Sequence, residues 1–399
     1  MDIELIRRLS IPAETKVVLC VLDGLGGLPG PRGRTELEEA DTLHLDRMAE
    51  DASLGQTLPV GYGITPGSGP GHMALFGYDP LAYEVGRGAL EATGIDFPLG
   101  PNDLAARGNL CTVDAEGRIT DRRAGRVATD VTAELCERLS TIALPGVEVF
   151  VLPVREHRFV LVLRGEGLSD ALTETDPQRE GVPPLPAEAT VPEAQRTADL
   201  VNEFVRQARA LLADREQANH LMLRGWSTRP ALPQLPELWK LRAAAVAVYP
   251  MYRGLARLVG MEILDAGDSL QTQMAAVEQC WDEYDFFFIH YKYADTGGED
   301  GDFHRKRQAI ADFDDHVPDV LKLKPNVVVV TGDHSTPSSM AAHSWHPVPL
   351  MIWGDHVRPD HVFRFSETEC ARGGLGTMPA KEVLPLAFAH ARRLTKYGA

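Results

Sequence analysis

Acidic and histidine side chains follow three apolar segments of this chain. They are Asp23 after VVLCVL, Asp295 and Glu299 after DFFFIHYKYA, and Asp333, His334 and His343 within TGDHSTPSSMAAHSWHP. Any one of them alone is typical of a cap or turn at a strand end. Together, carboxylate and imidazole groups from three strand ends can meet at one point, and this mixture of ligands suits Mn, Zn, Co or Mg. Two metals about 3.5–4 Å apart would hold both the attacking and the leaving oxygen of a phosphoryl transfer.

Ser68 lies in the Gly- and Pro-rich segment GITPGSGPGHMALFGYDP, which runs into an expected helix near His72. The segment by itself is equally typical of a flexible connector. A serine near a helix N-terminus, however, lies where backbone N–H groups favour phosphate and where a metal can activate its hydroxyl. Because a two-metal ligand set accompanies the segment, we favour Ser68 as a nucleophile.

The elements that must position these residues are short apolar runs followed by helix-like stretches, as in the mostly parallel sheet of an α/β domain. The clearest expected strands are Val17–Leu22, Ala243–Tyr249, Phe286–His290 and Val327–Thr331. Ligands of such sheets collect at the carboxyl ends of the strands. The predicted fold class is therefore α/β, with the candidate ligands at one edge of the sheet.

The middle of the chain has a different pattern. Strands are expected at Arg107–Val113, Val147–Leu152 and Phe159–Leu163, and a helix at Ala194–Ala213, after a Pro-rich stretch. We interpret residues 101–235 as a smaller α/β domain inserted into a metal-binding domain formed by residues 1–100 and 236–399. This interpretation rests partly on the resemblance described below.

The composition is that of a globular protein with about two domains. The chain has 399 residues, 44% of them hydrophobic, and a formal net charge of -17. Nucleic acids and anionic membranes recruit Lys and Arg, so this acidic balance argues against both as partners. An anionic substrate must instead be held by a local group of cations or by metals.

The cysteines indicate a reducing compartment. They are odd in number, scattered and without CxxC spacing, which is typical of free thiols. The N-terminal segment MDIELIRRLSIPAETK has charges where a signal peptide needs an apolar stretch, and no apolar run approaches the ~20 residues of a membrane span. We expect a cytoplasmic protein, and the sequence leaves its oligomeric state open.

An ordered series of motifs extends along nearly the whole chain: LDGLGG, LFGYDP, GRGALEATG, RGNLCTVD, DRRAGR, HRFVLVLRG, GLARLVGM, GEDGD, TGDHSTP and FSETECARGGLG. With this series the sequence resembles the archaeal-type cofactor-independent phosphoglycerate mutases of the alkaline phosphatase superfamily. The resemblance implies a phosphatase-like metal domain with an inserted transferase domain. It also implies a nucleophilic Ser68 that becomes phosphoserine, and no bisphosphoglycerate cofactor.

The resemblance also implies two metal sites. One set of ligands would be Asp23, Ser68, Asp333 and His334, and the other Asp295, Glu299 and His343. Many family members have His where Glu299 stands, so our hypothesis is a preference for Mn or Mg over Zn, with Co also possible as a ligand-compatible metal. The Gly69-Pro70-Gly71 loop and Arg253, where the family usually has Lys, are two further departures.

Arginines of the inserted segment are candidate ligands for the carboxylate and phosphate of a phosphoglycerate. The candidates are Arg122, Arg123, Arg126, Arg158 and Arg224, with Arg253 beyond them. For any one of them, a solvated surface charge is an equal alternative. His72 is a further candidate for substrate binding or for supporting the site. His290 is expected to pack inside, and Asp312, Asp314 and Asp315 to form a solvated helix face.

We predict an isomerase that interconverts 3-phosphoglycerate and 2-phosphoglycerate through phosphorylated Ser68. The nearest alternative is a metal-dependent phosphomonoesterase, or a mutase acting on another phosphorylated acid, because these share the metal core. A mutase must exclude water from its intermediate, whereas a phosphatase must admit it. A metal-binding protein without catalysis is a further alternative, and the retained ligand types argue against it.

Overall fold

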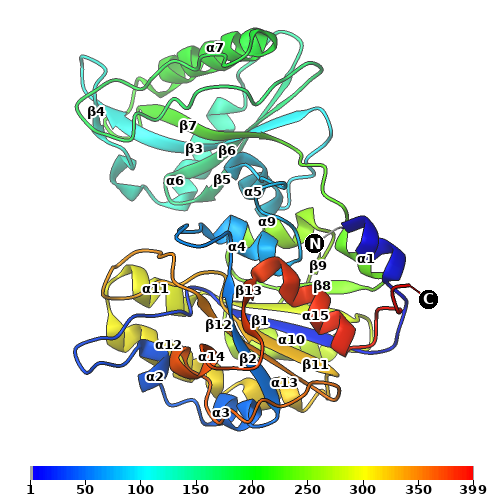
Figure 1. The fold of residues 1–399 in the computed structure, drawn as a ribbon. Helices are drawn as coiled ribbons and strands as arrows, with labels where there is room; N and C mark the ends of the chain where they lie inside the picture. Colours follow the sequence, from blue (N-terminus) through cyan, green and yellow to red (C-terminus); the bar gives the residue numbers. More distant parts are fainter. Residues whose placement is uncertain (1–2, 399) are drawn as a thin grey trace. The chain divides into compact units, whose positions relative to one another are not determined.

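The computed structural model describes residues 3–398, and the chain forms two compact units (Figure 1). One comprises Met1–Glu84 and Leu232–Ala399, and is described at residues 3–84 and 232–398; the other is Val85–Ala231. The second unit begins before the boundary of 101 that the sequence suggests. It does so because α5 (Arg87–Gly94) packs Ala89 and Ala92 against Ala105 and Val160 in the core of that unit.

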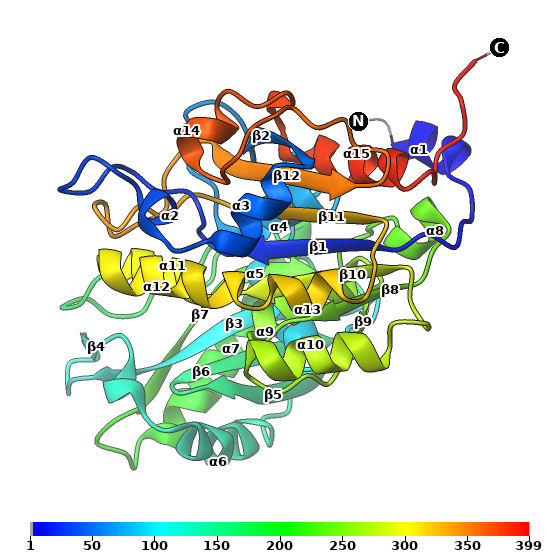
Figure 2. The same cartoon turned by 90° about the horizontal axis from the view of Figure 1, so that it is seen from below.

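The larger unit contains a mostly parallel sheet with the strand order β13-β2-β12-β11-β1-β10-β8-β9 (Figure 2). Its strands are β1 (Val17–Leu22), β2 (Ala52–Leu58), β8 (Ala243–Val246), β9 (Glu262–Ile263), β10 (Phe286–Tyr291), β11 (Val327–Thr331), β12 (Val348–Gly354) and β13 (Gly376–Pro379). Only β12 runs antiparallel to its neighbours. The predicted α/β class is confirmed. The expected strand from Ala243 ends at Val246, because Tyr249 caps the next helix.

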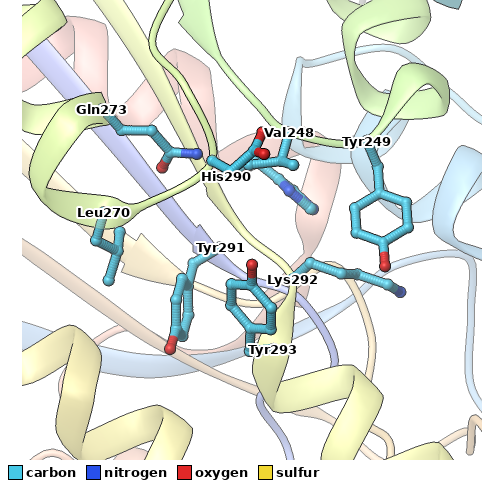
Figure 3. A pocket seen from close by; sticks show the side chains of 9 residues that line it. Val248, Tyr249, Leu270, Gln273, His290, Tyr291, Lys292 and Tyr293 are labelled. Carbon is cyan, nitrogen blue, oxygen red and sulfur yellow. The ribbon is translucent and has the colours of Figure 1, made fainter.

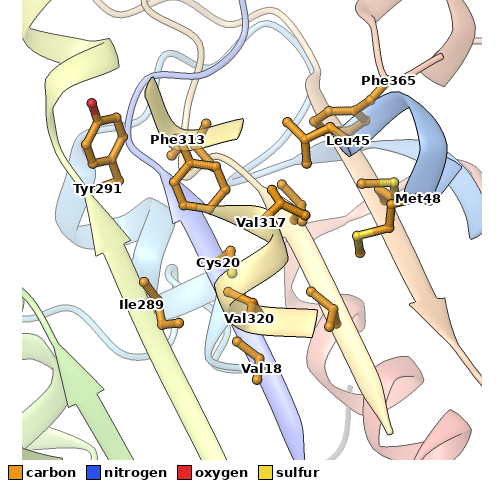
Figure 4. Close-up of a cluster of buried hydrophobic side chains, with 14 of the residues drawn as sticks. Val18, Cys20, Leu45, Met48, Ile289, Tyr291, Phe313, Val317, Val320 and Phe365 are labelled. Atoms are coloured by element: carbon orange, nitrogen blue, oxygen red, sulfur yellow. The ribbon is translucent and has the colours of Figure 1, made fainter. Parts of the chain in front are cut away.

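The central strands are buried on both faces, which explains their continuous apolar runs. On one face, Val18 and Cys20 of β1 and Ile289 of β10 lie in a core that includes Phe313 and Val317 (Figure 4). The helices that contribute most residues to this core are α3 (Leu43–Ala49), α10 (Leu270–Gln279), α12 (Phe303–Asp314) and α13 (Val317–Leu321).

Aromatic contacts mark the opposite face of the sheet. The ring centroids of Phe76 and Phe288 lie 4.9 Å apart, and those of Trp239 and Phe388 lie 4.5 Å apart. The helices on this face are α4 (Ser68–Leu75), α8 (Leu235–Trp239), α9 (Pro250–Leu258) and α15 (Val383–His390). The remaining helices of the unit are α1 (Ile3–Leu9), α2 (Glu36–Glu39), α11 (Tyr293–Glu299), α14 (Glu367–Cys370) and the 3₁₀ turn Ala380–Glu382.

The smaller unit is built on an antiparallel sheet. Its strands are β3 (Asp103–Val113), β4 (Ile119–Asp121), β5 (Glu148–Arg155), β6 (Arg158–Arg164) and β7 (His220–Thr228), with β3 paired to β4, β6 and β7. Leu161 and Leu163 face a core with α6 (Thr129–Leu139) and α7 (Gln195–Leu212), whereas Val160 and Val162 face α5. The 3₁₀ turns are Ala124–Arg126 and Pro192–Ala194. Strand β7 had no sequence prediction.

The expectation of a solvated face on α12 is wrong for Asp314. Its side chain is buried, and its two carboxylate oxygens accept hydrogen bonds from the backbone N–H groups of His44 at 3.0 Å and Leu45 at 2.7 Å. The carboxylate therefore accepts hydrogen bonds from two N–H groups of the first turn of α3, because the side chain of the N-cap residue makes no such bond. Among the described residues, none of the helices has the length and apolar character needed to cross a membrane.

Candidate active site

The candidate ligand segments follow three adjacent strands. Strand β1 lies between β11 and β10, and all three are parallel, so their carboxyl ends share one edge of the sheet. Asp23 follows β1 directly, Asp295 lies on α11 after β10, and Asp333 and His334 follow β11. The convergence that the sequence suggests is thus produced by the strand order.

Asp23, Asp333 and His334 form the first ligand group, with one ligand atom from each within 4.8 Å of the others. The Nε2 atom of His334 lies 3.3 Å from Asp23 Oδ1 and 3.2 Å from Asp333 Oδ2. All three side chains are fully buried, and these two carboxylate oxygens have no hydrogen-bond partner among the described residues. Buried carboxylate oxygens without donors fit a bound cation.

Asp295, His334 and His343 form the second ligand group. His343 Nε2 lies 3.7 Å from Asp295 Oδ1 and 3.6 Å from Oε1 of Glu299, which is half exposed at the rim. The rings of His334 and His343 stack with centroids 3.7 Å apart. His334 therefore belongs to both groups, whereas the family resemblance implies that it binds the first metal alone.

Ser68 is the first residue of α4, and its Oγ lies 3.2 Å from His334 Nε2. Helix α4 approaches this strand end very closely, because a Cβ atom on Gly71 would lie 2.4 Å from the Asp333 carbonyl oxygen. Pro70 is tolerated since N–H groups in the first turn have no partner within the helix. The Gly69-Pro70-Gly71 segment is thus the helix turn that brings Ser68 to His334.

The imidazole rings of His72 and His290 contact Ser68 and the two aspartates of the first ligand group. Nδ1 of His72 lies 2.8 Å from the Ser68 carbonyl oxygen and 3.1 Å from Asp333 Oδ2. Nε2 of His290 lies 3.1 Å from Asp23 Oδ2, and the ring of His290 stacks on Tyr252 with centroids 3.7 Å apart. His290 is buried, as expected. His72 is also fully buried, so it contacts protein groups of the site.

Lys292 is a residue of the site that sequence reasoning missed. Its Nζ lies 3.3 Å from Asp23 Oδ2 and also contacts Asp295 Oδ2, so one ammonium lies between carboxylates of the two ligand groups. Figure 3 shows Lys292 with His290 and Tyr293 among the residues that line a small pocket after β10. The sequence contains one signal for this role: Lys292 directly follows an apolar strand and lies three residues before Asp295.

Arginines of the smaller unit gather on one face of its sheet. Arg107 of β3 is paired in register with Arg224 of β7, and Asn109, two residues further along β3, is paired with Arg158 of β6. Because side chains alternate between faces, these four residues share a face. On α5, Arg87 lies over the same strands, since a Cβ atom on Gly225 would be 2.6 Å from Arg87 Cβ. We call Arg87, Arg107, Arg158 and Arg224 the arginine cluster.

The other predicted arginines have different surroundings. Arg122 Nη2 lies 2.8 Å from Asp176 Oδ2, and Arg224 Nη1 lies 3.6 Å from the same oxygen. Arg126 is exposed in a turn with a φ of 53°. Arg253 belongs to the larger unit, on α9. Arg122 is therefore linked to the arginine cluster through Asp176, whereas the Arg126 side chain is exposed to solvent.

Comparisons with known proteins point to one family. A family model described as 2,3-bisphosphoglycerate-independent phosphoglycerate mutase matches residues 49–218. Two relatives named probable 2,3-bisphosphoglycerate-independent phosphoglycerate mutase, from Thermotoga neapolitana and Thermus thermophilus, are 48% and 49% identical over 99% of this chain and 98% of theirs. The chain belongs to the 2,3-bisphosphoglycerate-independent phosphoglycerate mutase family.

Solved structures support this family and its fold. A cofactor-independent phosphoglycerate mutase from Thermoplasma acidophilum is 31% identical, with a TM-score of 0.74 over 94% of this chain and 100% of that one. A protein from Pyrococcus horikoshii is 28% identical, with a TM-score of 0.84 over 97% and 100%. The predicted resemblance is confirmed, as is the enzyme class of an isomerase that transfers phosphoryl groups within a molecule. Membership of the family implies divalent metal ions, for which the two ligand groups are suitable.

Electrostatics at this mutase-family site favour the ionised form of Asp23 and the neutral form of His334. Burial opposes ionisation of Asp23, but Lys292 and a hydrogen bond from His290 hold its pKa well below the usual range. Burial also lowers the pKa of His334, which favours the neutral imidazole that binds metals. In the smaller unit, burial lowers the pKa of Arg107 to about 10, with Glu91 opposing and Arg158 adding to the effect. Arg107 still stays charged at neutral pH.

Proposed function

We propose that this chain interconverts 3-phosphoglycerate and 2-phosphoglycerate through phosphorylated Ser68, with two divalent metals and without bisphosphoglycerate. The observation that carries the proposal is the position of Ser68 Oγ, 3.2 Å from His334 Nε2, beside two adjoining groups of metal-type ligands. The Ser68 oxygen forms a bond to phosphorus while the bond from phosphorus to the substrate oxygen breaks. The glycerate then presents its other hydroxyl, which takes the phosphoryl group back.

The proposed ligands of one metal are Asp23, Asp333 and His334 of the first group, with Ser68 added, and those of the other metal are Asp295 and His343 of the second group, with Glu299 added. When bound, such metals neutralise phosphate charge and lower the pKa of a serine hydroxyl. The chain's own residues orient this chemistry, since His72 and His290 hold Ser68, Asp333 and Asp23 in place. Carboxylates predominate here, which supports Mn or Mg over Co or Zn.

The substrate's anionic groups need fixed cations. We propose that the arginine cluster, together with Arg122, binds the carboxylate or phosphate of phosphoglycerate in the smaller unit. Two observations support this: Arg107 and Arg224 lie directly opposite each other, and Asn109 Oδ1 is buried there without a hydrogen-bond partner among the described residues. Arg126 and Arg253 are kept as further substrate contacts on the basis of the family resemblance. The smaller unit is accordingly the proposed transferase domain.

The test is conversion of 3-phosphoglycerate by metal-stripped protein, with Mn, Mg, Co or Zn restored singly and no bisphosphoglycerate added. Formation of 2-phosphoglycerate that is lost in Ser68→Ala is the expected result. Release of free phosphate without isomerisation would instead assign the chain to metal-dependent phosphomonoesterases. Conversion of a different phosphorylated acid would assign another substrate to the same mechanism.

The free thiols also support a reducing compartment, and we propose that the protein is located in the cytoplasm.

A further inference from the structure

A buried lysine lies directly behind the candidate metal ligands. Lys306 is on α12, its side chain is 0% exposed, and its Nζ donates hydrogen bonds to the carbonyl oxygens of Gly26 at 2.8 Å and Thr336 at 2.9 Å. Gly26 follows Asp23 on the loop after β1, and Thr336 follows His334 on the loop after β11. One ammonium therefore joins the two loops that carry the first ligand group.

The connection continues to the second group. The Thr336 hydroxyl lies 2.6 Å from Asp295 Oδ1 and 2.9 Å from His334 Nδ1, so it contacts ligands of both groups. The backbone N–H of Thr336 also donates to Gly26 O at 3.0 Å. A displacement of the Thr336 backbone by a few tenths of an ångström would thus be passed to Asp295 and His334 through direct contacts.

Two acidic side chains accompany the lysine, Glu36 fully buried and Glu367 partly buried. Glu36 Oε2 lies 3.9 Å from Lys306 Nζ and has no hydrogen-bond partner among the described residues, while Oε1 accepts from the N–H and hydroxyl of Ser338. Glu367 accepts from the N–H of Gly27 at 2.9 Å and from the hydroxyl of Thr35 at 2.6 Å. Each carboxylate thereby holds one of the same two loops. We call Lys306, Glu36 and Glu367 the loop brace.

Stability alone does not account for the loop brace. Removing each ion from water has an unfavourable free energy, and buried ion pairs can often be replaced by apolar residues without loss of stability. What an apolar side chain cannot supply is the pair of N–H bonds that fixes two loop carbonyls at one point. Groups behind metal ligands typically tune metal affinity because they orient those ligands.

We propose that Lys306 is a positioning residue that sets the spacing of the two metal-ligand loops and thereby the affinity for divalent metal. The inference rests on the proposed function, because it concerns the same metal groups. The hydrogen bonds of Lys306 Nζ go to backbone carbonyls, while Glu36 bonds to Ser338 of one loop and Glu367 bonds to Gly27 of the other.

The test measures Mn²⁺ binding by calorimetry in wild type, Lys306→Met and Lys16→Met. Lys16 is the matched control, since its Nζ also donates to two carbonyl oxygens, of Trp281 at 2.6 Å and Tyr284 at 2.7 Å, but at the opposite end of β1. We expect Lys306→Met to weaken Mn²⁺ binding about 10- to 100-fold, and Lys16→Met to leave it within about twofold, although both lose two hydrogen bonds.

A double variant separates charge balance from positioning. Lys306→Met combined with Glu36→Gln removes both charges of the pair. We expect this double variant to recover thermal stability while still binding Mn²⁺ weakly. If Lys306→Met alone does not fold, the double variant is measured in its place. Mn²⁺ binding at wild-type affinity in a folded Lys306→Met or double variant would overturn the proposal, as would equal weakening in Lys16→Met. Failure of the wild type itself to bind Mn²⁺ would instead overturn the proposed function.

Discussion

Ser68 Oγ lies 3.2 Å from Nε2 of His334, although the two residues are 266 positions apart in the chain. The contact exists because α4 begins at Ser68 and packs its Gly71 against the backbone of Asp333. It places a serine hydroxyl beside the histidine that adjoins both candidate metal groups. The proposed nucleophile and the proposed metal ligands thus come from segments that are distant in the sequence.

Replacement of Ser68 by Ala is expected to reduce isomerisation at least about 1,000-fold, because no other hydroxyl replaces the attacking oxygen. The measurement is formation of 2-phosphoglycerate, with mass spectrometry to detect a phosphorylated peptide in the wild type alone. Ser10→Ala is the control, since Ser10 is buried and bonded to Ile6 O far from the ligand groups. Full activity of Ser68→Ala would exclude Ser68 as the nucleophile.

Replacement of Glu299 by His is expected to move the metal preference from Mn or Mg towards Zn. Glu299 Oε1 faces His343 at 3.6 Å, so the substitution exchanges a hard oxygen for an imidazole nitrogen beside an existing imidazole. Activity of stripped protein with each metal, measured for both forms, gives the comparison. Glu299 is 54% exposed, so the fold should tolerate the change. Higher activity of the wild type with Zn than with Mn or Mg would contradict the hypothesis that Glu299 favours Mn or Mg.

Replacement of Arg158 by Ala is expected to raise KM for phosphoglycerate about tenfold or more, because a charged hydrogen bond to substrate is lost. Mn²⁺ affinity should not change, since Arg158 lies in the other unit from the ligand groups. Arg206, which pairs with Glu203 on the exposed face of α7, supplies the matched control as Arg206→Ala. If both variants keep the wild-type KM, the arginine cluster does not bind substrate.

His157 is expected to make the protein less stable in mild acid. Burial, with a contribution from Arg158, lowers the pKa of His157 to about 4, against about 6.5 in an unfolded chain. Above pH 6.5 His157 is neutral in both states and does not lower the free energy of unfolding. As pH falls from 6.5 towards 4, the free energy of unfolding decreases, because the unfolded state then binds a proton that the folded state excludes. Between pH 7.5 and pH 5 this amounts to about 2 kcal/mol.

Urea unfolding at the two pH values measures this effect. His157→Gln removes the titrating group, so its free energy of unfolding should change less over this pH range than that of the wild type. Carboxylates shared by both proteins cancel in the difference. Parallel pH profiles of the two proteins would show that His157 titrates alike in the folded and unfolded states.

Local patterns in the sequence determine much of this protein. The apolar runs of β1, β10 and β11 predict buried parallel strands. Asp23 follows β1 directly and Asp333 lies two residues after β11, so their position at one edge of the sheet can be expected. The order of motifs along the chain indicates the family. Ser68 is a candidate from the sequence as well, since a glycine-rich helix start is a short-range signal, and its nearness to the ligands becomes visible only in the structure.

Tertiary structure alone decided which charged residues work together. The segment around Lys306 and Asp314 has the alternating charge of a solvated helix, yet both side chains are buried, because α12 packs on the loops and on α3. Arg107 and Arg224 meet only through the register of β3 with β7. Strand order and register join residues that are distant in the chain, and such long-range pairings leave no local pattern in the sequence from which a buried charge or a shared face can be predicted.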